Sequence, residues 1–140
     1  MAKKGSLFVI CGPMFSGKSR ELIRVTHIAE IAGQSTALFK PRIDTRYSHM
    51  DVSSHDGIRR QAYVVDTARE ILSIFLSMDR RPDVIAVDEG QFFDSGLPDA
   101  ALWLVEQGHR VVIAGLDRNF RGEPFGSMPE IGRASCRERV

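Results

Sequence analysis

Short apolar runs alternate along the chain with stretches of helical periodicity. Five runs predict strands, at residues 7–10, 36–39, 62–65, 84–87 and 111–114. The run at 84–87 is continuously apolar, which is typical of a strand buried on both faces of a parallel sheet. Because helical stretches separate these runs, the pattern predicts an α/β fold in which helices cover both faces of a parallel sheet.

Three of the stretches between strands predict amphipathic helices. The first ends at Gly33, and its expected buried face is Leu22, Val25, Ile28, Ala29 and Ala32. The second begins at a cap supplied by Asp66 or Thr67 and ends near Met78, with an apolar face of Ile71, Leu72, Phe75 and Leu76. The third spans residues 99–107, and its apolar positions are Leu102, Leu104 and Val105, with Trp103 expected to pack on the sheet. The polar stretch at 41–57 is expected to be a long loop.

Composition limits the size and the partners of the protein. A chain of 140 residues suits a single compact domain. Lys and Arg number 19 and Asp and Glu number 18, so the net charge of +1 creates no broad positive field for nucleic acid or a membrane. Cys11 and Cys136 are too distant to suggest a disulfide framework, and Cys11 is expected to be a small core residue. The first apolar run is too short for a signal peptide, so a cytoplasmic location is expected.

The turn after the first strand carries the strongest chemical motif of the chain. It fits G-x-x-x-x-G-K-S, with the residues Gly12, Pro13, Met14, Phe15, Ser16, Gly17, Lys18 and Ser19. Backbone N–H groups at the start of the next helix face a bound anion, and Lys18 adds charge at the β- and γ-phosphates of ATP. Ser19 is expected to bind Mg2+. The alternative, a glycine-rich turn with a solvated lysine, is disfavoured because the motif lies between a predicted strand and a predicted helix.

An acidic motif follows the strand at 84–87. Asp88 is expected to hold the Mg2+ of the nucleotide, as the acid at a strand end does in P-loop enzymes. Glu89 beside it is expected to orient or deprotonate the nucleophile. The alternative is that either carboxylate caps the turn after the strand.

Five segments in this order resemble the motifs of type II thymidine kinases. They are GPMFSGKS at 12–19, DTRY at 44–47, SHDG at 54–57, DEGQFF at 88–93 and GLDRNFRGEPFG at 115–126. The resemblance implies a P-loop NTPase fold of the RecA-like type. It also implies transfer of the γ-phosphoryl group of ATP to the 5′-hydroxyl of thymidine or deoxyuridine, by a homotetramer.

The same resemblance assigns roles to individual residues. Glu89 is expected to be the general base, and Lys18 and Arg46 are expected to stabilise the transferring phosphoryl group, with support from Asp44. The pocket for the base is expected to be lined by Met14, Phe92, Leu116, Phe120 and Phe125. From the residues alone, a stacking role on a base and a plain core role are both open for Phe92, Phe93, Phe120 and Phe125.

The chain departs from the family pattern near its C-terminus. The zinc-binding lobe of the family and the loop that closes over the nucleoside are missing, so residues 1–130 are expected to form the kinase domain and no zinc ligand is expected in this chain. Residues 131–140 are expected to be a non-native tail, because one reading frame of a common sequencing-adapter oligonucleotide encodes IGRASCRERV. The 140 residues alone are therefore expected to bind ATP with little or no turnover. Two other functions stay open, a P-loop ATPase that acts on nucleic acid and a nucleotide-binding module without catalysis.

Overall fold

The computed structural model describes residues 5–12, 17–42, 51–53, 59–115 and 136–139, and at 51–53, 59–61 and 136–139 it describes the backbone only. In chain order the elements are β1 (Ser6–Cys11), α1 (Lys18–Ile31), β2 (Thr36–Pro41), β3 (Asp51–Ser53), β4 (Arg59–Gln61), β5 (Tyr63–Val65), α2 (Ala68–Ser77), β6 (Val84–Val87), the 3-10 helix η1 (Gly90–Phe92), α3 (Leu97–Glu106), β7 (Arg110–Gly115) and β8 (Cys136–Arg139). All five predicted strands and all three predicted helices are present.

Six strands form one sheet, in the order β5-β2-β6-β7-β1-β8. Every neighbouring pair in this sheet is parallel, so the carboxyl ends of its strands reach the same edge. β7 lies between β1 and β6, with Ala114 opposite Ile10 and Ile113 opposite Val87. The predicted α/β fold with a parallel sheet is confirmed.

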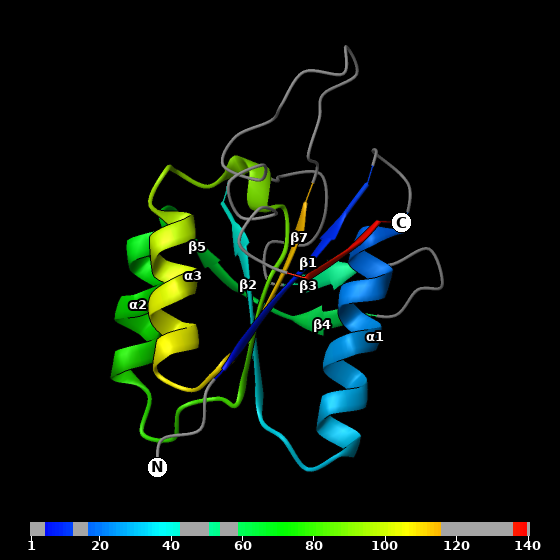
Figure 1. The fold of residues 1–140 in the computed structure, drawn as a ribbon, viewed down its shortest axis with the longest axis horizontal. Helices are drawn as coiled ribbons and strands as arrows, with labels where there is room; N and C mark the ends of the chain where they lie inside the picture. Colours follow the sequence, from blue (N-terminus) through cyan, green and yellow to red (C-terminus); the bar gives the residue numbers. More distant parts are fainter. Residues whose placement is uncertain (1–4, 13–16, 43–50, 54–58, 116–135, 140) are drawn as a thin grey trace.

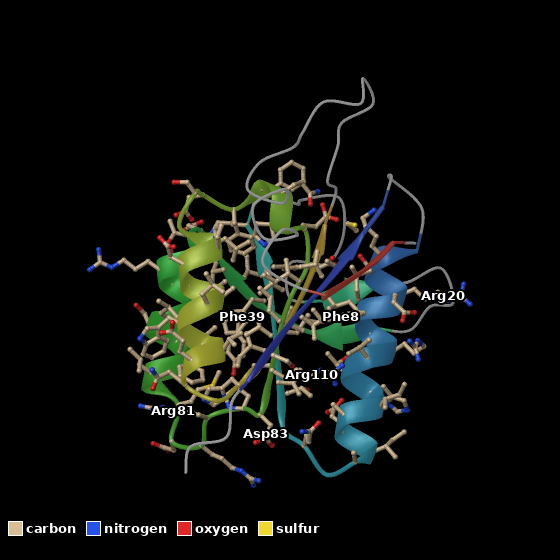
Figure 2. All side chains as sticks on the ribbon, in the orientation of Figure 1. Phe8, Arg20, Phe39, Arg81, Asp83 and Arg110 are labelled. Atoms are coloured by element: carbon tan, nitrogen blue, oxygen red, sulfur yellow. The ribbon has the colours of Figure 1, made fainter. Side chains whose placement is uncertain are left out.

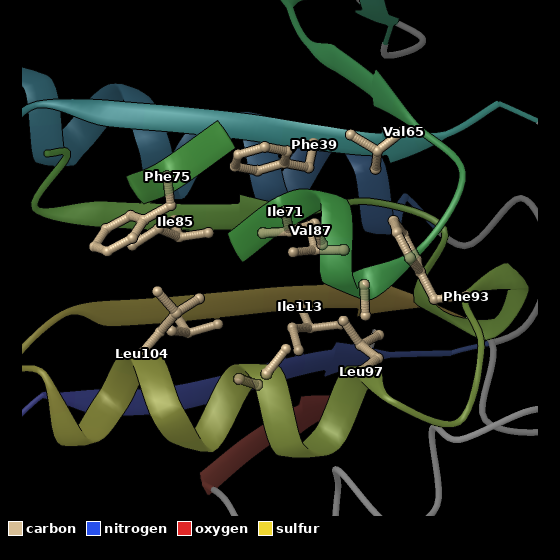
Figure 3. Packing of buried hydrophobic residues seen from close by; sticks show 14 of the residues in the cluster. Phe39, Val65, Ile71, Phe75, Ile85, Val87, Phe93, Leu97, Leu104 and Ile113 are labelled. Carbon is tan, nitrogen blue, oxygen red and sulfur yellow. The ribbon is translucent and has the colours of Figure 1, made fainter. Parts of the chain in front are cut away.

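Helices cover both faces of the sheet, as predicted. Figure 1 shows α1 on one side and α2 with α3 on the other. The larger core cluster, which includes Phe39 and Phe75, lies between the sheet and α2 and α3 (Figure 3). The smaller cluster lies under α1 and includes Leu22 and Val112, and Phe8 packs against this cluster. Phe8 and Phe39 therefore lie on opposite faces of the sheet (Figure 2). No helix in the described ranges combines the length and the apolarity that crossing a membrane requires.

The buried face of α1 differs from the predicted one. Ile28 is 50% exposed and Ala32 is exposed too, whereas the other three predicted residues are buried. Ile23 and Thr26 are buried in their place. Thr26 tolerates burial because its Oγ1 donates a hydrogen bond to the carbonyl oxygen of Ile23 at 2.8 Å. Gly33 follows the helix with a φ of 87°, the left-handed conformation that a terminating glycine adopts.

The start of α2 decides between the two predicted caps. Thr67 is the N-cap, and its Oγ1 accepts a hydrogen bond from the N–H of Glu70 at 3.3 Å. Asp66 instead pairs with Arg42, whose Nε donates to Asp66 Oδ1 at 2.7 Å. The helix ends where predicted, but Leu76 is 51% exposed, so its expected place on the apolar face was wrong.

The helix α3 begins two residues earlier than predicted. Pro98 stands in its first turn, where the fixed φ of proline favours helix initiation. Of its apolar positions, Leu104 is buried and Leu102 is 40% exposed. Trp103 packs edge-on against Phe75 of α2, with the two ring centroids 6.2 Å apart, and belongs to the residues packed against the core cluster between the sheet and these helices.

Two short segments behave differently from the sequence-based expectation. Asp51–Ser53 lies within the predicted loop at 41–57, yet it forms β3, which pairs antiparallel with β4. Cys136–Arg139, within the predicted non-native tail, forms β8 and pairs with β1 at the edge of the sheet. Strand pairing uses backbone groups that every non-proline residue carries, so β8 does not depend on whether the tail is native. The non-native origin of residues 131–140 stays a prediction.

Candidate active site

The carboxyl edge of the sheet brings together the phosphate loop and the acidic motif. β1 leads into the loop before α1, and β6 ends directly before Asp88 and Glu89. Because these strands are parallel and separated by β7 alone, both motifs emerge at the same edge. Open α/β sheets bind their ligands outside the carboxyl ends of the strands.

The first turn of α1 is suited to an anion. Gly17 precedes this helix with a φ of 93°, a left-handed conformation that glycine adopts without strain. As the N-cap, Gly17 has no side chain that could accept the N–H groups of the first turn, and such N–H groups attract phosphate. Lys18 is the first helical residue and is 8% exposed, and a buried ammonium is costly unless an anionic group lies near it. Gly12, directly after β1, is buried as well.

A hydrogen bond joins the two motifs across 69 residues of sequence. Ser19 Oγ donates to Asp88 Oδ2 at 2.9 Å, and Asp88 is 5% exposed. The other oxygen of this carboxylate, Oδ1, accepts the N–H of Glu89 at 2.9 Å. A hydroxyl and a carboxylate are oxygen ligands of the kind that Mg2+ prefers, and a hydroxyl that donates its proton keeps lone pairs for a cation. Ser19 and Asp88 therefore fit the predicted ion.

Glu89 has an unusual backbone conformation. Its φ of 54° and ψ of 45° place it in the left-handed region, and it is the non-glycine residue with a positive φ in the described part of the chain. This conformation costs an L-residue about 1–2 kcal/mol. Strain of this kind gathers at functional sites. The Glu89 carboxylate accepts a hydrogen bond from Gln91 Nε2 at 3.1 Å.

Phe92, the last residue of η1, and Phe93, which follows it, differ in burial. Phe93 is 5% exposed and belongs to the core cluster under α2 and α3, where Figure 3 labels it. Of the two uses that the sequence left open for its ring, Phe93 therefore has the core role. Phe92 is half-buried, so both of the uses that the sequence left open for its ring stay open.

The remaining predicted site residues lie outside the described part of the chain. They are Pro13, Met14, Phe15, Ser16, Asp44, Arg46, Leu116, Phe120 and Phe125. Their roles stay predictions.

A second buried lysine at this edge was missed by sequence analysis. Lys40, near the end of β2, is 4% exposed. The paired register of β2 and β6 ends with Phe39 opposite Val87, so Lys40 is the next residue along, level with Asp88. Leu38 faces α1, and alternation along the strand directs Lys40 to the same face. The available signal was a lysine directly after a predicted apolar strand.

Asp94 was also missed, and it ties the segment after the acidic motif to α2. Its Oδ1 accepts the N–H of Ala68 at 2.8 Å, and its Oδ2 accepts the N–H of Gly96 at 3.2 Å. An aspartate two residues before a glycine is a turn signal. The contact with α2, which lies 26 residues earlier, has no signal in the sequence.

Comparison with known proteins identifies close relatives over most of the chain. The thymidine kinase family model matches residues 5–136. A thymidine kinase of Porphyromonas gingivalis is 50% identical over 127 residues, which cover 91% of this chain and 60% of that protein. Thymidine kinases of Bacteroides thetaiotaomicron and Bacteroides fragilis are 49% and 50% identical over 129 residues, 92% of this chain and 63% of each relative. The chain thus spans less than two thirds of the length of the curated relatives that it matches.

The matched range includes both motifs of the carboxyl edge and the strands from β1 to β7. It ends at residue 136, beyond residue 130, where the sequence resemblance was expected to end. The chain belongs to the thymidine kinase family.

Proposed function

We propose that the complete protein transfers the γ-phosphoryl group of ATP to the 5′-hydroxyl of thymidine or deoxyuridine. The observation that carries this proposal is the hydrogen bond of 2.9 Å between Ser19 and Asp88, which joins the phosphate-loop helix to the acidic motif. The family match and the printed names of the relatives support thymidine as the acceptor.

The described residues divide the work of the proposed reaction. Lys18 and the N–H groups of the first turn of α1 bind the phosphates and offset the negative charge that spreads over them in the transition state. Ser19 and Asp88 hold Mg2+, which supplies further electrostatic stabilisation of that charge when it is bound. Glu89 accepts the proton of the 5′-hydroxyl as its oxygen attacks phosphorus.

Phe92 and several residues outside the described ranges complete the proposed site. Arg46 stabilises the transferring phosphoryl group, and Asp44 supports it. The base pocket is formed by Phe92 together with Met14, Leu116, Phe120 and Phe125. The proposal for the complete protein also includes a zinc site in a further lobe, a homotetrameric assembly and a cytoplasmic location.

The first test is a phosphorylation assay on the protein from the complete gene, with ATP and each of the common deoxynucleosides. Thymidine and deoxyuridine are the expected acceptors. Glu89→Gln is expected to lower turnover by about 10² to 10⁴, the range typical of removing a general base, while ATP binding persists. Glu106→Gln, at the exposed end of α3, is the matched control and should keep full turnover. Full turnover by Glu89→Gln would remove this carboxylate from the mechanism.

The second test separates the kinase from the other two candidate functions. ATP consumption by the complete protein is expected to rise with thymidine and not with single-stranded DNA. Stimulation by DNA would support an ATPase acting on nucleic acid, and nucleotide binding without either response would support a non-catalytic module. The 140-residue chain is expected to bind magnesium nucleotide with little or no turnover, so robust thymidine phosphorylation by this chain would contradict that part of the proposal.

A further inference from the structure

Gln91 is a buried amide placed directly against the proposed general base. It lies at the centre of η1 and is 4% exposed. Its Nε2 donates a hydrogen bond to Glu89 Oε2 at 3.1 Å. A buried amide is costly to remove from water unless it makes hydrogen bonds, so an apolar residue would fill this position at lower cost. The amide therefore points to a role in which its hydrogen bond matters.

The Glu89 side chain needs external support to keep one orientation. A glutamate has three side-chain torsions and samples many orientations by itself. Asp88 Oδ1 accepts the Glu89 N–H at 2.9 Å and fixes the backbone, whose φ of 54° sets the direction of the Cα–Cβ bond. The hydrogen bond from Gln91 fixes the other end of the side chain, at the carboxylate. Backbone and carboxylate are thus held by two neighbouring polar side chains.

An amide is chemically suited to this place beside a base. An N–H group that donates to a carboxylate favours the ionised form, which is the form that accepts a proton. An amide nitrogen carries no charge and does not release its proton, so it does not compete with the reacting hydroxyl as a proton source. A lysine or arginine at the same position would form an ion pair with the carboxylate and weaken it as a base.

We propose that Gln91 is a positioning residue, which holds the Glu89 carboxylate in the orientation that receives the proton of the attacking hydroxyl. This inference rests on the proposed function, in which Glu89 is the general base. Gln91 acts through the Glu89 carboxylate, to which its Nε2 donates a hydrogen bond.

The kinetic test uses Gln91→Met in the complete protein, because methionine has a similar length and no N–H donor. We expect kcat to fall by about tenfold, the effect of losing one hydrogen bond to a charged group that orients a catalytic side chain, with an unchanged KM for ATP and an unchanged unfolding temperature. Gln107→Met, at the exposed C-cap of α3, is the matched control and should leave kcat unchanged.

A double variant tests whether Gln91 acts through Glu89. In the Glu89→Gln background no base is left to orient, so Gln91→Met is expected to cause no further loss of kcat. A tenfold loss in both backgrounds would place the effect of Gln91 elsewhere and overturn the inference. An active wild-type protein whose kcat is unaffected by Gln91→Met would overturn it as well, whereas a wild type that does not phosphorylate thymidine would refute the proposed function itself.

A spectroscopic test does not depend on activity. In the 140-residue chain labelled with 13C at the glutamate carboxyl carbons, the signal of Glu89 is the one that disappears in Glu89→Gln. We expect Gln91→Met to shift this signal at a fixed pH, because the hydrogen bond from Gln91 Nε2 to Glu89 Oε2 is lost. Gln107→Met should leave it in place. An unchanged signal in Gln91→Met would overturn the inference.

Discussion

The carboxylate of Asp94 is predicted to stabilise the fold by linking the start of α2 to the segment between η1 and α3. Its two oxygens accept the N–H groups of Ala68 and Gly96, at 2.8 and 3.2 Å. Asp94→Ala leaves both N–H groups without this acceptor, and one of them belongs to the first turn of α2. Asp94→Asn keeps an oxygen that can serve Ala68 but replaces the second oxygen by an NH2 group, which cannot accept from Gly96.

The size of the effect follows from the exposure of the group. Loss of a helix-capping side chain costs about 0.5–2 kcal/mol. Asp94 is exposed, so water replaces part of what is lost, and we expect about 1 kcal/mol for Asp94→Ala and about half of that for Asp94→Asn. For a chain of this size, 1 kcal/mol corresponds to a fall of about 3–5 °C in Tm.

Thermal and urea unfolding of the 140-residue chain, followed by circular dichroism, measure this difference. Asp79→Ala, an exposed aspartate after the end of α2, is the matched control and should not lower Tm. Hydrogen exchange gives the local readout, since the amides of Ala68 and Gly96 should exchange faster in Asp94→Ala. Equal Tm values for Asp94→Ala and Asp79→Ala, with unchanged exchange at both amides, would refute the reasoning.

Two further predictions concern other parts of the fold. A Cβ at Gly5 would lie 2.0 Å from the carbonyl oxygen of His109, so Gly5→Ala should lower the free energy of unfolding in urea by about 3 kcal/mol. Gly33 has open space around it and a φ of 87°, so Gly33→Ala should lower it by only about 1 kcal/mol. Equal losses in the two variants would contradict the steric argument. The hydrogen bond from Arg24, whose Nε lies 3.0 and 2.9 Å from the Glu21 carboxylate oxygens, lowers the pKa of Glu21 below its ordinary 4.5. The stability that this ion pair contributes is therefore fully present above the ordinary pKa of Glu21 and is lost as the pH falls through the lower pKa of the folded state. Arg24→Gln should therefore lower the free energy of unfolding more at pH 7 than at pH 3. An equal loss at both pH values would show that the pair does not contribute.

The strand pattern predicted the sheet well because central parallel strands are apolar on both faces. All four residues of β6 are buried, and their continuous apolar run is visible without any tertiary information. The helices were predicted less accurately in their buried faces. Periodicity identifies a helix, but it does not fix where the centre of the buried stripe lies. Ile28 is apolar and exposed, while Thr26 is polar and buried, because a hydroxyl that bonds to the preceding turn can face the core.

The candidate site was predictable where a local motif implies a backbone shape. The spacing of the phosphate loop and the acid after an apolar strand singled out Lys18, Ser19 and Asp88, and the structure brings Ser19 and Asp88 into a hydrogen bond at one edge. The supporting groups could not be predicted in the same way. Gln91 reaches the Glu89 carboxylate because the backbone turns in the left-handed conformation at Glu89. The burial of Gln91 depends on packing, which a single sequence does not reveal.

The position of β7 has a consequence for what the site can hold. Neighbouring strands are about 4.8 Å apart, so the presence of β7 separates β1 from β6 by about 10 Å. Its last two residues, Ala114 and Gly115, are small and buried. If β1 and β6 were direct neighbours, the start of α1 at Lys18 would crowd the turn that carries Glu89. The strand order itself therefore sets the spacing between these two segments at the carboxyl edge.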